Sequence, residues 1–297
     1  MPYSPAQAEA YAETIRAIYA EAETRLLAAV AKRAARGIDT DGWAEKRLRE
    51  VRALLAEAQQ EMGQLSLFDP AVAEAIEQAG DMGAAAAVRD LRDVIGAPLT
   101  DIDAELSQAG QLAVRSLTRQ TVVNLQNGRL MILRRVQDAY RDVVQRAAGQ
   151  TLAGAVTRRQ AAQVALDDFA NRGITGFVDR AGRSWDMASY AEMATRSATG
   201  QAAVTGHADR LEGNGYDLVI VSDSPEECDI CRAWEGKILS LTGRTPGYPT
   251  MAEAKAAGLF HPNCTHTFGV YIEGETRVPR GMNDADRYEI KQQQRAN

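Results

Sequence analysis

The chain has 297 residues, a formal net charge of −6 and 45% hydrophobic residues, while aromatic residues make up only 6%. This length allows two ordinary domains, or one domain beside a long helical body. Much of the apolar content is alanine, which favours helices and buries little area per residue, so we expect an elongated body of long, closely packed helices. The negative charge argues against a general nucleic-acid coat.

The start of the chain, MPYSPAQAEAYAE, lacks the basic and apolar regions of a signal peptide, and no apolar run approaches the length of a membrane span. The three cysteines cannot all pair with one another, which fits a reducing compartment better than a disulfide framework. We therefore expect synthesis in a cytoplasm and no membrane partner.

The first half of the sequence reads as helix. Ser4 and Pro5 are a helix-start signal, and Gly37 is a stop. Further helices are predicted over 39–63, over 69–80, and from Asp101 to about Gly149 with possible interruptions at Gly110 or Gly128. In the last of these, apolar residues recur at helical spacing; they are Ile132, Val136, Tyr140, Val143 and Ala147.

The last third changes character. Strands are predicted over 216–222, 237–241 and 266–274, because these runs are short and rich in β-branched or aromatic residues. Thr250 with Glu253 fits a capping box for a short helix between the second and third strands. The fold class is therefore mainly α, with a small C-terminal α+β module that binds zinc.

The predicted domains follow from this change. Residues 1–210 form the helical body, with a possible internal boundary near 97–101. Residues 211–275 form the small module, and 276–297 form a polar tail.

Nine arginines and only two acidic residues lie between Arg115 and Arg159. One interpretation is a solvated helix face packed on acidic neighbours of the same bundle. The other is a surface that contacts DNA or an acidic partner, because arginines pair with phosphates and carboxylates. The candidate residues for such a contact are Arg115, Arg119, Arg129, Arg134, Arg135, Arg141 and Arg146.

All three cysteines and two of the three histidines lie in one segment, as Cys228-x2-Cys231 and His261-x2-Cys264-x-His266. A Cys-x2-Cys turn directs two thiolates to one side, and a distant second pair can complete a tetrahedron around zinc. The favoured ligands are the three cysteines with one histidine. His266 is preferred to His261, because Cys-x-His in an extended segment brings both side chains to one side.

Four such ligands leave no open coordination position, so the predicted zinc is structural. Two alternatives stay open: reduced cysteines without metal, and a disulfide between Cys228 and Cys231. A third is a nucleophilic thiol at Cys264 activated by His266.

The run GITGFVDRAGRSWDMASYAEMATRSATG, the following ECDIC pair and the later HPNCTH element resemble the minor capsid proteins of tailed bacteriophages, within the wider head-morphogenesis group. The resemblance is specific over about Gly173 to Gly274. It implies a structural protein of the phage head, made in the bacterial host cytoplasm and present in the virion at the portal vertex or in the capsid interior. It also implies a role in head assembly and in DNA packaging or ejection.

The partners implied are the portal protein, the major capsid protein or both, with packaged DNA and an oligomer around the portal as further alternatives. The resemblance implies no enzyme. The competing hypotheses are a zinc-dependent hydrolase or toxin acting on nucleic acid, and an internal DNA-contacting protein. Within the shared motif we interpret Trp185, Tyr190 and Met193 as packing residues. Arg196 is interpreted as a bridge from its helix to the zinc module, through carbonyls or a carboxylate such as Asp223. His207 is interpreted as an ordinary surface or packing residue.

Overall fold

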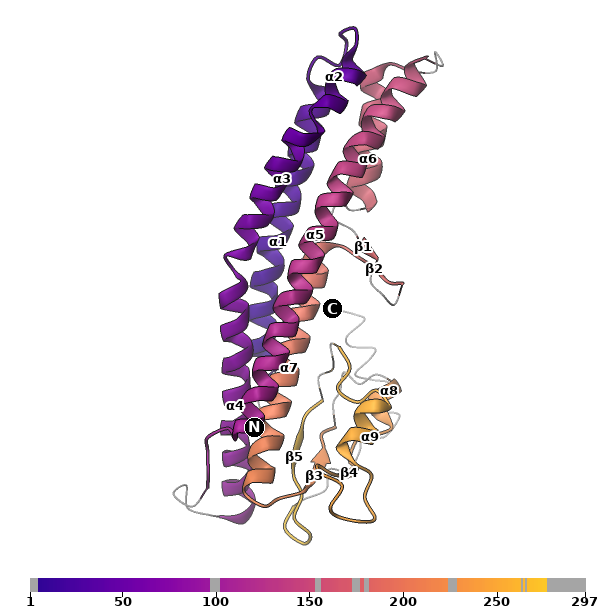
Figure 1. Cartoon of the computed structure of the whole chain (residues 1–297). Helices are drawn as coiled ribbons and strands as arrows, with labels where there is room; N and C mark the ends of the chain where they lie inside the picture. The colour runs from indigo at the N-terminus through magenta and orange to yellow at the C-terminus, as the bar shows by residue number, and fades with distance from the viewer. Residues whose placement is uncertain are drawn as a thin grey trace. The chain divides into compact units, whose positions relative to one another are not determined.

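The computed structural model describes residues 5–96, 102–152, 156–172, 177–178, 182–223, 229–262, 264 and 266–276. Within these ranges the protein is mainly helical, as predicted (Figure 1). The helices of the first 213 residues are α1 (Pro5–Ala35), α2 (Trp43–Arg49), α3 (Val51–Ser66), α4 (Asp69–Ile95), α5 (Gln108–Leu152), α6 (Arg158–Arg172) and α7 (Met187–Gly213).

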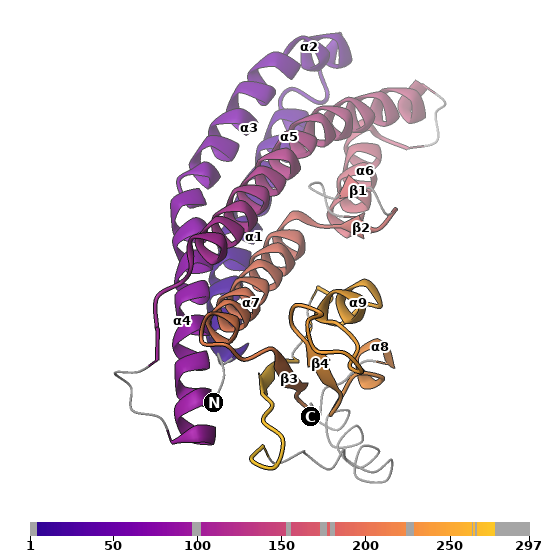
Figure 2. The ribbon, with the colours of Figure 1, turned by 60° about the horizontal axis from the view of Figure 1, so that its bottom comes forward.

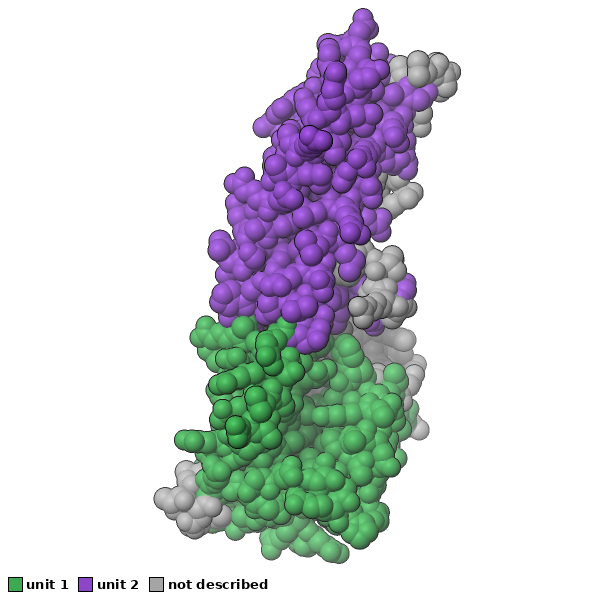
Figure 3. Space-filling view, in the orientation of Figure 1, with its two compact units in different colours: residues 1–11, 73–119, 195–297 green, residues 12–72, 120–194 purple. Residues whose placement is uncertain are grey.

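The chain divides into two compact units, coloured in Figure 3. Unit 1 comprises Met1–Tyr11, Ala73–Arg119 and Thr195–Asn297, and unit 2 comprises Ala12–Val72 and Gln120–Ala194. Helices α1, α4, α5 and α7 each contribute residues to both units. The boundary predicted near residue 210 lies inside unit 1, and a separate module beyond it stays a prediction.

Unit 2 is built on the apolar stripes of its helices. The residues predicted to form one face of α5 are all completely buried; they are Ile132, Val136, Tyr140, Val143 and Ala147. They share the interior of the unit with Tyr19 and Leu26 of α1 and with Leu54 of α3. This spacing is what a helix needs to bury one face, so the periodic pattern was a reliable signal.

One predicted helix of unit 2 is two helices in the structure. The segment predicted as continuous over 39–63 contains α2 and α3, which are separated at Glu50. The Glu50 amide donates to Arg47 O, three residues back, which tightens the chain there. Arg47 Nη1 donates to both Glu50 Oε2 and Arg33 O, so the junction is held to the end of α1.

The predicted end of a helix at Gly80 is wrong, because α4 continues to Ile95. The glycines here allow α4 and α7 to approach closely within unit 1. A Cβ at Gly83 would lie 2.0 Å from Ala203 O, and a Cβ at Gly206 would lie 2.0 Å from Gly80 O. Close backbone approach, and not helix termination, explains glycine at these positions.

Glycine does not interrupt helix α5 either, because this helix runs continuously through Gly110 and Gly128. A Cβ at Gly110 would lie 2.5 Å from Asp209 Cγ, and Gly128 faces the ring of Tyr190 at 3.9 Å. The helix begins at Gln108 rather than at Asp101, which is outside the described residues.

Unit 1 contains a three-stranded antiparallel sheet in the order β4-β3-β5. Its strands are β3 (Leu218–Val221), β4 (Ile238–Ser240) and β5 (Phe268–Val270), all inside the predicted strand segments. The connections carry α8 (Asp229–Arg232) and α9 (Met251–Ala256), and Figure 1 and Figure 2 show the sheet beside the last turns of α7. Unit 2 has a short antiparallel pair, β1 (Phe177–Val178) with β2 (Ser184–Trp185), that was not predicted.

The capping box predicted for α9 is present. Thr250 accepts a hydrogen bond from the Glu253 amide at 3.1 Å, and the Glu253 carboxylate accepts one from the Thr250 amide at 2.7 Å. The reciprocal bonds satisfy two amides that a helix start leaves without partners.

The sheet shares its core with the long helices of unit 1. One cluster of buried residues joins Leu91 of α4 and Leu211 of α7 to residues of the strands, α8 and α9. Val219, Leu239 and Phe268 represent the three strands in this cluster. The region around the cysteines therefore does not depend on a core of its own.

His207 also lies at this junction, as a packing residue. It is 4% exposed; its Nε2 lies 3.0 Å from Asp90 Oδ2 of α4, and its ring lies 4.9 Å from the ring of Phe268 in β5. The imidazole therefore contacts both a helix and the sheet of unit 1.

Candidate metal centre

Three residues of the predicted cluster meet in the structure. Cys231 belongs to α8 and is completely buried. Cys264 lies in the loop after α9, and His266 stands two residues before β5 and is 4% exposed. The sheet brings the three side chains together because β5, which follows Cys264 and His266 in the sequence, pairs with β3, which precedes Cys231.

The donor atoms are close enough to bind one ion. Cys231 Sγ lies 3.6 Å from Cys264 Sγ, and Cys264 Sγ lies 3.5 Å from His266 Nδ1. All three atoms lie within 4.8 Å of one another. At 3.6 Å, the sulfurs of Cys231 and Cys264 are not joined by a disulfide. The cluster could therefore hold a metal ion.

Glu235 completes the arrangement. His266 Nε2 lies 2.8 Å from Glu235 Oε1, and the two side chains are only 2% and 4% exposed. Because a carboxylate accepts, Nε2 carries the proton and Nδ1 faces the sulfur. A metal-binding histidine typically donates its second ring N–H to a carboxylate in this way, which fixes the orientation of the ring.

A tight turn puts Glu235 in this position. The Trp234 amide donates to Cys231 O at 2.8 Å, and Gly236 adopts a left-handed conformation with φ of 67°. The turn folds the chain back directly after α8, so that a residue four positions beyond Cys231 reaches His266. Sequence reasoning missed Glu235; the only local signal was a carboxylate beside a glycine in a turn.

The pair of Cys264 and His266 favours charged forms when no metal is bound. Burial opposes this, but hydrogen bonds with Cys264 and Glu235 outweigh it and raise the pKa of His266 to about 9. Burial alone would also raise the pKa of the Cys264 thiol, yet hydrogen bonds from the His266 ring and amide lower it. The environment thus stabilises a thiolate at Cys264, the form that binds a metal.

The two other predicted ligands differ in position. Cys228 lies outside the described residues. His261 is not part of the cluster of three; its Nδ1 lies 2.7 Å from the neighbouring Pro262 carbonyl. Of the two histidines, His266 is in the cluster and His261 is not, and the choice of ligand stays a prediction.

A thiol, an imidazole and a carboxylate in this order also resemble a nucleophile with its base. The second thiol favours metal binding, because Cys231 Sγ occupies space directly beside the Cys264 sulfur. Two sulfurs and one nitrogen are a donor set that soft or borderline metals prefer.

The predicted arginine surface is not uniform. Arg129 is 5% exposed, and its guanidinium donates to both carboxylate oxygens of Asp69 and to the hydroxyl of Tyr19. The three distances are 2.6 to 2.8 Å. Arg129 is thus held inside unit 2, where it ties α5 to α1 and α4.

The other candidate arginines lie on the surface of α5. Arg146 pairs with Asp142 at 2.7 Å, four residues earlier on the same helix. Exposed positions are also occupied by Arg115, Arg119, Arg134, Arg135 and Arg141. Six of the seven candidate arginines are therefore exposed along α5, and Arg129 is the buried exception.

The shared motif residues pack as half-buried groups. The rings of Trp185 and Tyr190 meet edge to face at 6.0 Å, and Arg183 lies over Trp185 at 5.5 Å. Met193 is half-buried. Arg196, in unit 1, lies 3.4 Å from Glu9. Trp185 and Tyr190 thus make packing contacts, whereas Arg196 forms an ion pair with Glu9. The predicted bridge from Arg196 to the zinc module stays a prediction.

The fold and site define a helical protein with a small sheet and a cysteine–histidine cluster able to hold a metal ion. The chain matches the family described as phage minor capsid protein 2 over residues 3–297, and it belongs to this family. The match confirms the predicted resemblance and extends it over nearly the whole chain. No curated protein and no solved structure matches the chain.

Family membership supports a structural role in the phage capsid and a place in the virion. Among the described residues, no helix combines the length and apolar character that crossing a membrane requires.

Proposed function

We propose that the protein is a low-copy structural component of a tailed-phage head, acting at the portal vertex or inside the capsid in head assembly and in DNA packaging or ejection. The observation that supports it is the family match over residues 3–297. Its partners are the portal protein, the major capsid protein or both. In this proposal the protein acts by binding these partners through its surface, and no enzymatic step is part of it.

The proposal includes a structural zinc ion held by Cys231, Cys264 and His266, with Cys228 as the fourth ligand. The separations of the donor atoms fit. Two sulfurs about 2.3 Å from a tetrahedral zinc lie about 3.8 Å apart, and a sulfur and an imidazole nitrogen lie about 3.6 Å apart. The corresponding distances in the protein are 3.6 and 3.5 Å.

Within the site, each residue of the chain has a distinct task. Cys231 and Cys264 supply thiolates, and Glu235 holds the His266 ring so that Nδ1 faces the sulfurs. A bound zinc would supply a cross-link between α8 and the segment leading into β5.

The metal content of the purified protein tests this part. One zinc per chain by elemental analysis, reduced to background in Cys264→Ser, is the expected result. A His261→Ala variant serves as the matched control, because His261 is near the site but outside the cluster, and it should keep its zinc. Purified protein without bound metal, prepared with zinc present, would contradict the zinc assignment.

Binding to the portal tests the structural part. Purified portal rings and purified major capsid protein are presented separately to the full chain, and binding is followed by interferometry. The proposal predicts saturable binding to at least one of them. Binding to neither would contradict the docking role and leave the metal site unaffected.

A further inference from the structure

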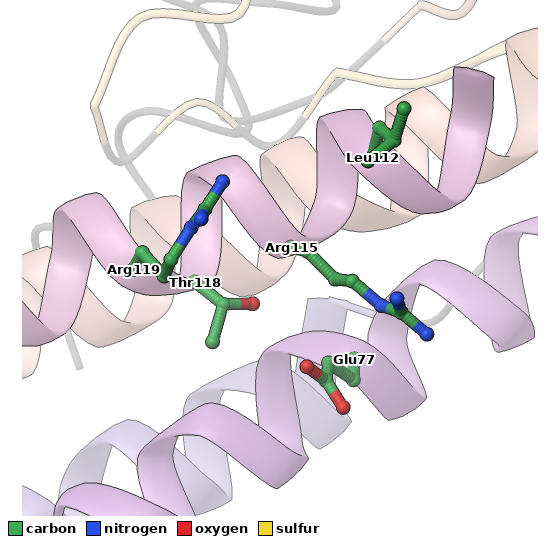
Figure 4. A pocket seen from close by; sticks show the side chains of 5 residues that line it. All are labelled: Glu77, Leu112, Arg115, Thr118 and Arg119. Carbon is green, nitrogen blue, oxygen red and sulfur yellow. The ribbon is translucent and has the colours of Figure 1, made fainter. Parts of the chain in front are cut away.

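A surface groove lies between α4 and α5 in unit 1. It has a volume of about 340 Å³ and is lined by Glu77, Leu112, Arg115, Thr118 and Arg119. Figure 4 shows Glu77 and Thr118 in the space between the helices, with Arg115 reaching from α5 toward α4. The groove is small and bordered by charged groups, which suits a few side chains of a docked segment better than an enclosed ligand.

The charges on the α5 wall are available for a partner. Among the residues that the structure describes, neither Arg115 nor Arg119 takes part in an ion pair, whereas Arg146 of the same helix does. The two arginines are four positions apart, so they stand one helical turn apart on one side of α5. Paired guanidinium groups at this spacing match two carboxylates one turn apart on another helix.

The groove also offers an apolar contact. Leu112 is 56% exposed, and it stands three residues before Arg115 and seven before Arg119. These spacings place Leu112 on the same side of α5 as the arginines. An exposed leucine beside two cations indicates contact with a protein segment that has apolar as well as acidic side chains.

The opposite wall of the groove favours a protein partner over a nucleic acid. Glu77 of α4 borders the groove across from the arginines. A phosphate backbone in the groove would meet this carboxylate and would leave Leu112 without an apolar contact. A peptide can place a lysine or an amide against Glu77 while its own carboxylates face the arginines.

We propose that this groove docks an acidic, amphipathic segment of another protein of the phage particle, with two carboxylates one helical turn apart beside an apolar residue. This inference rests on the proposed function, since it assumes that the chain is part of the particle. Arg115 and Arg119 bind the carboxylates, and Leu112 receives the apolar side chain.

The test places a photo-crosslinking amino acid at Ser116, an exposed residue of the same turn, in protein produced during phage infection. Purified particles are irradiated, and the crosslinked peptides are identified by mass spectrometry. The expected product joins this position to a segment of a different virion protein that carries the acidic and apolar pattern. In Arg115→Glu/Arg119→Glu its yield should fall at least about tenfold.

The matched control is Arg134→Glu/Arg135→Glu, which reverses two exposed arginines of α5 outside the groove and should leave the yield unchanged. Crosslinks to DNA or to a second copy of this chain would overturn the inference. No crosslink, or a yield insensitive to the first reversal, would do the same. Absence of the protein from the particles would instead overturn the proposed function, and the inference with it.

Discussion

His266 and Glu235 stand 31 residues apart in the sequence, yet they form a buried contact of 2.8 Å between Nε2 and Oε1. Glu235 therefore determines which nitrogen of His266 faces Cys264. This buried carboxylate is informative about the site because it accepts from Nε2 of His266 and so fixes the tautomer that metal binding requires.

Replacing this carboxylate tests its role. Glu235→Gln keeps the size of the side chain but removes its charge, so we expect the metal affinity to fall by about tenfold to a hundredfold. Competition against a chromophoric chelator measures the change. Glu253→Gln is the control, since that carboxylate caps the start of α9 and is not part of the cluster. Equal affinities of the Glu235 variant and the native protein would contradict the assignment.

The carboxyl of Asp217 makes the folding stability of the protein depend on pH. Burial would raise the pKa of this carboxyl, but hydrogen bonds from Ser240, Thr242 and Thr245 hold it well below its usual 3.8. Its stabilising effect is therefore complete above about pH 4 and is lost as the pH falls through the lowered pKa.

Asp217→Asn should accordingly lower the free energy of unfolding by about 2 kcal/mol at pH 7, because hydrogen bonds to a charged acceptor are replaced by weaker ones. Denaturant titrations from pH 7 down to pH 2 measure the difference. The gap between variant and native protein should narrow at the acid end. A gap that stays constant throughout would show that the charge of Asp217 is not the cause.

Because α4 and α7 approach closely in unit 1, we expect glycine-to-alanine substitutions at two positions of α7 to change stability in opposite directions. Gly206→Ala puts a methyl group 2.0 Å from Gly80 O, so the helices must separate. We expect a loss of about 2 kcal/mol or more. Gly200→Ala, in the same helix with nothing within 4 Å, should gain about 0.5 kcal/mol from helix propensity.

Thermal unfolding of the two variants makes this comparison. Equal effects of Gly206→Ala and Gly200→Ala would mean that the two helices are not in backbone contact.

The buried pair of Arg129 and Asp69 predicts a loss of stability rather than a loss of binding. Arg129→Ala leaves the carboxylate of Asp69, which is 13% exposed, without its main partner, so unit 2 should lose about 3 kcal/mol. Arg134→Ala, on an exposed site of the same helix, should change stability by less than about 0.5 kcal/mol. Chemical denaturation distinguishes them, and similar values would contradict the structural role of Arg129.

The parts of this fold that depend on local pattern could be predicted from the sequence. The buried stripe of α5, the capping box at Thr250 and the three strands of the sheet follow from periodicity, side-chain type and spacing, which act over a few residues. The cysteine and histidine spacing likewise predicted a cluster that the structure brings together in part, at Cys231, Cys264 and His266.

The parts that could not be predicted depend on residues far apart in the chain. Gly80 was interpreted as a helix stop because the approach of Gly206, from α7, is invisible in a local window. Glu235 was overlooked because its partner is in another loop. Arg129 looked like its exposed neighbours because the carboxylate of Asp69 comes from a different helix.

The central claim, that this chain is a low-copy component of the phage head, is tested most directly by counting it. Quantitative mass spectrometry of purified phage particles and of DNA-free procapsids gives the copy number relative to the major capsid protein. The account predicts that the protein is present in both, at a small fraction of the major capsid protein copy number. Its absence from both would contradict the account.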